Sequence, residues 1–113
     1  MTSVEDEFYL DLNKVTLFGW EPFKNYDYVS DMIDSIEEGK NFFPVPVGKI
    51  NENTYSLVWG VKDRKYNLLA DGGHNRALAH YITSVPLKCE LYPFHPLPDN
   101  NFRIPISEII LKI

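Results

Sequence analysis

A glycine turn between a predicted strand and a predicted helix, at residues 69–80, is the strongest structural signal in this chain. Two successive glycines allow positive φ and let a ligand approach the backbone closely. An alanine-rich stretch follows and favours helix. Because N–H groups at a helix start have no partner within the helix and attract anions, the turn predicts a site for a nucleotide phosphate. The residues expected to bind it are Asp71, Gly72, Gly73, His74, Asn75 and Arg76.

A simpler explanation of the same turn is purely structural. Asp71 would then act as a local cap where a strand passes into a helix. His74 and Arg76 favour the functional interpretation, since such a turn needs neither an imidazole nor a guanidinium. If a phosphate does bind here, a valine at Gly73 is expected to block its approach and leave the core intact.

Hydrophobic patterns predict one α+β domain over residues 1–113, a small mixed sheet with helices packed against it. Val29, Met32, Ile33 and Ile36 recur at helical spacing, so residues 26–38 are expected to form a helix that Gly39 ends. A second helix is expected at 74–82. Strands are expected at 8–12, 44–50, 55–59, 66–69 and 87–91, with 55–59 and 66–69 pairing as a hairpin.

Glycine and proline predict where regular structure is interrupted. Residues 15–24 are expected to form a loop because they contain Gly19 and Pro22. From about residue 93 the chain is rich in proline, and this extension is expected to run over the surface. Residues 107–113 fit either a short helix or a short strand.

Composition limits the classes of partner. With 16 acidic and 11 basic residues the net charge is −5, which disfavours non-specific binding to a DNA backbone. A single cysteine excludes an intramolecular disulfide and a cysteine-rich zinc site, and no metal site is expected. No apolar run is long enough to span a bilayer, and no basic signal region precedes one. The expected compartment is the cytoplasm, with no membrane partner.

Three motifs in order resemble the ParB/sulfiredoxin superfamily over roughly residues 10–92. The segment 71–76, D-G-G-H-N-R, is similar to the superfamily pattern D-G-x-H-R before an alanine-rich helix. A following strand begins V-P at Val85 and Pro86. Upstream, residues 29–39 and then P-V-P-V at 44–47 resemble the superfamily's S-I-x-x-x-G and P-I-x-V segments.

The resemblance implies a fold and an activity. The free serine kinase-like and sulfiredoxin-like members are closest in motif, and the kinases use a glutamate in an early loop, where Glu21 stands. The resemblance implies an ATP-dependent phosphotransferase or NTPase, with ATP or CTP as the nucleotide, with or without Mg²⁺. The residues expected to be catalytic are Glu21, which would activate the acceptor, and His74, which would neutralise developing charge.

Two other functions stay open. In the first, the domain is a non-catalytic nucleotide-sensing or protein-binding module that keeps the anion pocket. A ParB-like nuclease or DNA-associated protein ranks behind both because of the acidic charge. The acceptor, a small molecule or a protein, is not identified by the sequence, and a homodimer is left open.

Overall fold

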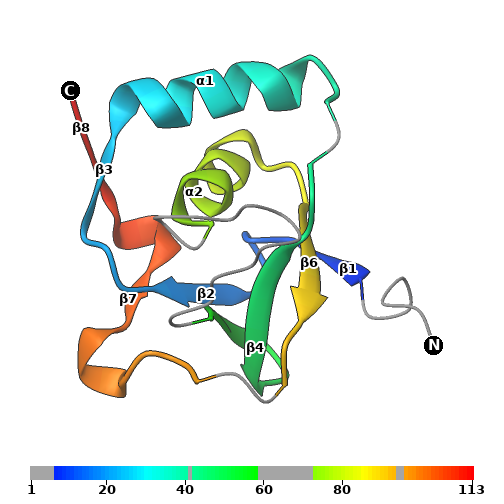
Figure 1. Cartoon of the computed structure of the whole chain (residues 1–113), viewed down its shortest axis with the longest axis vertical. Helices are drawn as coiled ribbons and strands as arrows, with labels where there is room; N and C mark the ends of the chain where they lie inside the picture. Colours follow the sequence, from blue (N-terminus) through cyan, green and yellow to red (C-terminus); the bar gives the residue numbers. More distant parts are fainter. Residues whose placement is uncertain (1–6, 41, 59–72, 94–95) are drawn as a thin grey trace.

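Two helices are set among groups of strands along the chain, in an α+β fold (Figure 1). This computed structural model describes residues 7–40, 42–58, 73–93 and 96–113. The elements, in order, are β1 (Glu7–Leu10), β2 (Thr16–Gly19), β3 (Phe23–Asn25), α1 (Tyr26–Glu37), β4 (Val45–Asn51), β5 (Thr54–Leu57), α2 (His74–Thr83), β6 (Leu87–Leu91), β7 (Ile104–Pro105) and β8 (Ile110–Lys112). Short 3-10 turns lie at Asn100–Phe102 (η2) and Ile106–Glu108 (η3).

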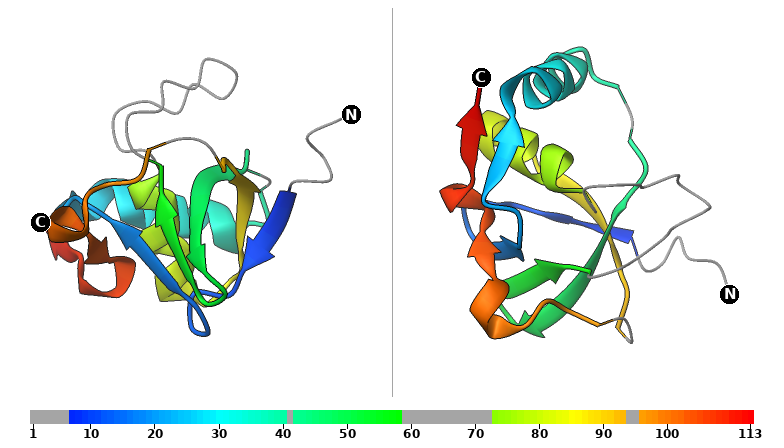
Figure 2. Two further views of the ribbon diagram at one scale, coloured as in Figure 1. Left: turned by 90° about the horizontal axis from the view of Figure 1, so that it is seen from below. Right: turned by 60° about the vertical axis from the view of Figure 1, so that its left-hand side comes forward.

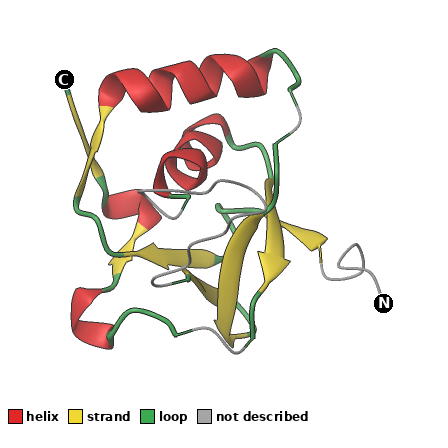
Figure 3. Ribbon diagram, in the orientation of Figure 1, coloured by secondary structure: helices red, strands yellow, loops and turns green. Residues whose placement is uncertain are grey.

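The main sheet mixes parallel and antiparallel neighbours (Figure 3). Its strand order is β1-β6-β4-β5-β2-β7. The β6–β4 and β5–β2 pairs are parallel, and the other three pairs are antiparallel. A separate two-stranded sheet joins β3 to β8 in parallel, so the last strand lies beside the segment that leads into α1 (Figure 2).

The first helix forms as its sequence predicts. The side chain of Asn25 caps its start by accepting a hydrogen bond from the Asp27 N–H at 2.8 Å. Val29 and Ile36 are buried on the expected apolar face. Gly39, at φ +78, lies just beyond the last turn, in the left-handed conformation that commonly ends helices.

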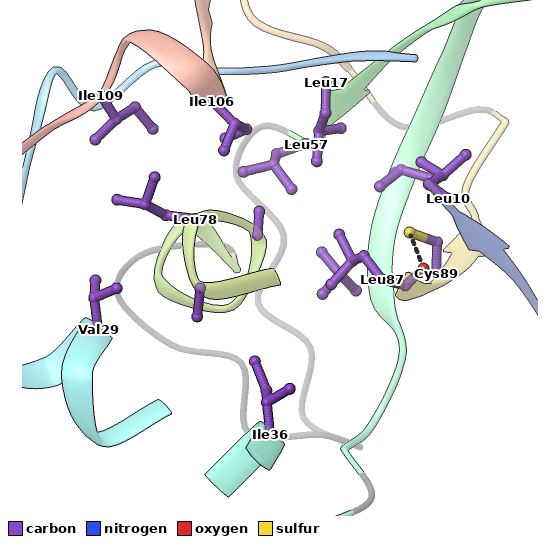
Figure 4. Close-up of a cluster of buried hydrophobic side chains, with 14 residues drawn as sticks. Leu10, Leu17, Val29, Ile36, Leu57, Leu78, Leu87, Cys89, Ile106 and Ile109 are labelled. Atoms are coloured by element: carbon purple, nitrogen blue, oxygen red, sulfur yellow. Dashed lines mark hydrogen bonds between the residues drawn. The ribbon is translucent and has the colours of Figure 1, made fainter. Parts of the chain in front are cut away.

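The second helix is the centre of the molecule. Core side chains surround it, from α1 on one side and from the sheet and the C-terminal segment on the others (Figure 4). Ala77, Leu78 and Ala79 are all buried. His74, Arg76 and His80 of the same helix are buried as well, and the two alanines let neighbouring elements approach closely.

One prediction from glycine and proline is wrong, and another holds in part. Residues 15–24 contain β2 and β3 in addition to a turn, because these strands find partners far away in sequence. The proline-rich stretch is largely exposed over residues 96–102, as expected, whereas Ile106 and Ile109 beyond it are buried in the core. The last strand, β8, resolves the choice left open for residues 107–113.

Other predictions are confirmed or untested. The strands β1, β4, β5 and β6 and both helices lie where they were expected, within a few residues. The second strand of the predicted hairpin, at 66–69, and its charged turn lie outside the described residues. Instead, β5 pairs with β4 and with β2. None of the described helices has the length and apolar character needed to cross a membrane.

Candidate functional site

Gly73 sets the geometry at the start of α2. Its backbone is left-handed, with φ +100 and ψ 7, which glycine adopts without the usual steric cost. A Cβ at this position would lie 2.7 Å from the Cγ1 atom of Val45. The expectation that valine at Gly73 leaves the core intact is therefore wrong, because valine would meet both a disfavoured φ and the side chain of β4. Asp71 and Gly72 lie outside the described residues.

His74, the first residue of α2, is fully buried against the end of β2. Its Nε2 atom accepts a hydrogen bond from the Trp20 N–H at 3.0 Å, with the Glu21 N–H 3.4 Å away. The Trp20 ring lies edge-on to the imidazole, with centroids 4.5 Å apart. Since Nε2 accepts, the hydrogen-bond network assigns the proton of the neutral ring to Nδ1.

Glu21 lies between His74 and Lys24. Its Oε2 atom is 3.2 Å from Nδ1 of His74, and its Oε1 atom is 3.2 Å from the Lys24 ammonium. Oε2 is buried and makes no hydrogen bond within the described structure, so its contact with Nδ1 is an electrostatic one. The three side chains, which we call the Glu21 cluster, run outward from the core: His74 is 0% exposed, Lys24 12% and Glu21 31%.

The two residues predicted to be catalytic are thus in contact, although 53 positions separate them in sequence. Glu21 reaches solvent, whereas His74 does not. Of these two side chains, the carboxylate is therefore the one that a molecule at the surface can contact. His74 is placed to orient Glu21 and to hold a proton at Nδ1.

Asn75 and Arg76 follow on other faces of the helix. Asn75 is half-buried in the first turn. Arg76 is buried and donates a hydrogen bond from its guanidinium to the carbonyl oxygen of Phe43. Two residues along a helix correspond to a rotation of about 200°, so Arg76 points away from His74 and toward the segment that enters β4.

Sequence reasoning missed three residues of this site. The i, i+3 spacing between Glu21 and Lys24 could have indicated their ion pair. That spacing brings two side chains together only where the backbone turns. Gly19 had no local signal. A Cβ there would lie 2.4 Å from Nε2 of His74, so the glycine makes room for the imidazole. Trp20 was not predicted to be part of the site, and its N–H and its ring both contact His74.

Metal ligands do not gather in the part of the chain that the structure describes. No group of three or more histidine, cysteine, aspartate or glutamate side chains lies close enough together there to hold an ion.

No model of a known protein family matches this chain, and neither the curated proteins nor the solved structures give a significant match.

Proposed function

We propose that this domain binds the phosphate of a nucleotide at the start of α2 and transfers a phosphoryl group to a hydroxyl acceptor or to water. The observation that carries the proposal is the Glu21 cluster, a partly exposed carboxylate held between a buried imidazole and an ammonium. A general base needs a fixed orientation within hydrogen-bond reach of the acceptor proton. Contacts with His74 and Lys24 would hold the carboxylate in that way.

The chemistry of the nearby donors supports the phosphate part of the proposal. The cluster lies where α2 begins, and the N-terminal end of a helix dipole favours negative charge. Lys24 adds a positive charge beside Glu21. A bound triphosphate would supply the transferred group, while Glu21 takes the acceptor proton and His74 keeps its own proton at Nδ1.

The second candidate is a non-catalytic nucleotide-sensing or protein-binding module. It is favoured by the complete burial of His74 and by the bond that its Nε2 accepts from the Trp20 N–H. An imidazole in this position stabilises the turn between β2 and β3 whether or not any reaction occurs. The anion site would then be kept without catalysis.

Thermal denaturation with ATP, CTP, GTP and their diphosphates, each with and without Mg²⁺, tests binding. A ligand at about 100 times its Kd, binding only the folded state, stabilises it by about 2.7 kcal/mol and raises Tm measurably. If no nucleotide raises Tm, both nucleotide functions fail. A nucleotide that binds without turnover, with either a hydroxyl acceptor or water, indicates the non-catalytic module.

Glu21→Gln tests the proposed base. It keeps the shape of the side chain, so nucleotide binding should change little, and turnover should fall by about 10²–10⁴-fold. Glu37→Gln, an exposed carboxylate in the last turn of α1, is the matched control and should leave both unchanged. Turnover that survives Glu21→Gln would show that another group takes the proton.

A further inference from the structure

A second site lies on the other side of α2 from His74. Arg76 and His80, one helical turn apart, face a cavity of about 180 Å³. Phe42 and Phe43, from the segment before β4, form a second wall. The strand β6 and the residues before it close the third side. This cavity shares no lining residue with the Glu21 cluster.

The charged side chains of the cavity are all basic. Arg76, Lys40 and Lys88 contribute to its lining, and none of the described lining residues is acidic. Both lysines have acidic neighbours outside the lining: Glu38 lies 3.2 Å from Lys40, and Glu7 lies 3.7 Å from Lys88. Such pairs at the surface are weak and are screened by salt. The cavity therefore keeps a cationic character.

Arg76 gives this charge a fixed position. It is 7% exposed, and its bond to the carbonyl oxygen of Phe43 orients the guanidinium at the cavity wall. Its positive charge also contributes to the lowered pKa of His80. The larger cause of the lowered pKa of His80 is burial, which disfavours its charged form.

The rest of the wall is apolar. Ile36 from α1 and Leu87 from β6 are buried beside the cavity. The Phe42 ring lies edge-on to the imidazole of His80, with centroids 6.3 Å apart. His80 itself is held by a 2.9 Å contact between its Nδ1 atom and the Val85 carbonyl oxygen, which assigns the ring proton to Nδ1. A ligand here meets a guanidinium at one point and hydrocarbon around it.

We propose that this cavity binds a small monocarboxylate with an aromatic or branched apolar body, its carboxylate directed at Arg76. A guanidinium presents a planar fork that matches a carboxylate. The volume of the cavity equals that of about six water molecules in the liquid. It lies below the range of about 300–1,000 Å³ that is typical of pockets for larger organic ligands. A nucleotide does not fit, so this ligand is distinct from the one at the Glu21 cluster.

Phenylacetate is the probe, titrated into ¹⁵N-labelled protein and followed by two-dimensional NMR. We expect saturable shifts at the amides of Phe43, His80 and Val85, which border the cavity. Phenylacetamide has the same shape without the charge and should bind at least tenfold more weakly. Equal binding of the amide, equal binding of inorganic phosphate, or no saturable shift below about 10 mM phenylacetate would overturn the proposal.

Variants locate the carboxylate. Arg76→Gln should weaken phenylacetate binding by tenfold or more. Because a buried arginine also contributes to packing, Lys88→Glu gives a second test at the mouth of the cavity, where a reversed charge should weaken binding severalfold. Lys14→Gln is the matched control, a lysine with a similarly weak ion pair and 81% exposure, away from the cavity. Equal affinity in Lys88→Glu and Lys14→Gln would refute the site even if Arg76→Gln does not fold.

Discussion

Replacing Gly19 by alanine tests the packing on which the Glu21 cluster depends. The added Cβ would lie 2.4 Å from Nε2 and 2.6 Å from Cδ2 of His74, closer than any such contact in a relaxed structure. The imidazole is fully buried and has little freedom to move. Overpacking of this kind costs about 1–3 kcal/mol. A displaced ring would also lose its bond from the Trp20 N–H, worth about 1–3 kcal/mol more.

Gly48→Ala is the matched control, because it adds the same methyl group to another buried strand of the same sheet. There the nearest atom is Cδ2 of Leu97 at 2.6 Å, the end of a flexible side chain that is only half-buried. A rotamer adjustment costs about 0.5–1.5 kcal/mol. We therefore expect Gly19→Ala to lose about 2–6 kcal/mol of unfolding free energy and Gly48→Ala clearly less.

Urea denaturation of both variants measures the difference, with the m-value checking that unfolding stays two-state. The ¹⁵N chemical shifts of the His74 ring provide a second readout. They should show Nδ1 protonated and Nε2 accepting in the wild type, and a changed environment in Gly19→Ala. If Gly19→Ala is no less stable than Gly48→Ala, His74 is not held by this packing, and its role in orienting Glu21 is refuted.

Three further outcomes follow from single side chains. Burial holds the folded-state pKa of His80 below its usual 6.5, so the unfolded chain binds more protons between these two values. The unfolding free energy should therefore fall as the pH drops below 6.5 toward the lowered pKa. His80→Gln should flatten this part of the pH profile measured by urea unfolding, and parallel profiles of the two proteins would contradict the prediction. Burial also raises the pKa of the Cys89 thiol, so iodoacetamide at pH 8 should modify Cys89 only as urea unfolds the protein. Rapid modification of the native protein would show that Cys89 is not packed in the core. Asn25→Ala should lower the free energy of unfolding by about 1 kcal/mol by removing the cap of α1, whereas Asn25→Asp should keep most of that stability. Equal stability of the wild type and both variants in urea would exclude a stabilising cap.

Local signals were sufficient for the elements that depend on local interactions. The helix α1 has an apolar stripe at helical spacing and Gly39 beyond its end, and both features act within a few residues. The cap of α1 by Asn25 is likewise local, so the interactions that set the ends of this helix lie within the sequence window that predicts it. The strand β6 was expected at its observed bounds, although its partners β1 and β4 are distant in sequence.

The elements missed by the sequence are stabilised by distant partners. Gly19 was taken for a breaker, yet it ends a strand and makes room for an imidazole 55 positions later. Pro105 has no strand signal in the sequence, yet it lies in β7, an edge strand, where the missing N–H is tolerated. The burial of Ile106 and Ile109 likewise depends on α2 and β2, which no local pattern around residue 106 could show.

The candidate site was predictable in part. Glu21 and His74 were each identified, but from separate motifs, and only the structure brings them into contact. The direction of Arg76 was available from the sequence, since residues two apart on a helix cannot share a face. Grouping Arg76 with His74 at one phosphate therefore combined two sides of α2 that the structure keeps apart.

The position of Glu21 depends on two segments that are distant in sequence, α2 and β8. His74 contacts its carboxylate from α2, and Gly19 provides the space for that imidazole. On the far side, the Ile110 N–H donates to the Pro22 carbonyl oxygen at 2.9 Å, and β8 pairs with β3 directly after it. The C-terminal strand thus fixes the backbone next to Glu21, while the core fixes its side chain. The chemistry proposed for this carboxylate would consequently depend on the docking of β8, because losing that strand would free the loop without removing any residue of the Glu21 cluster.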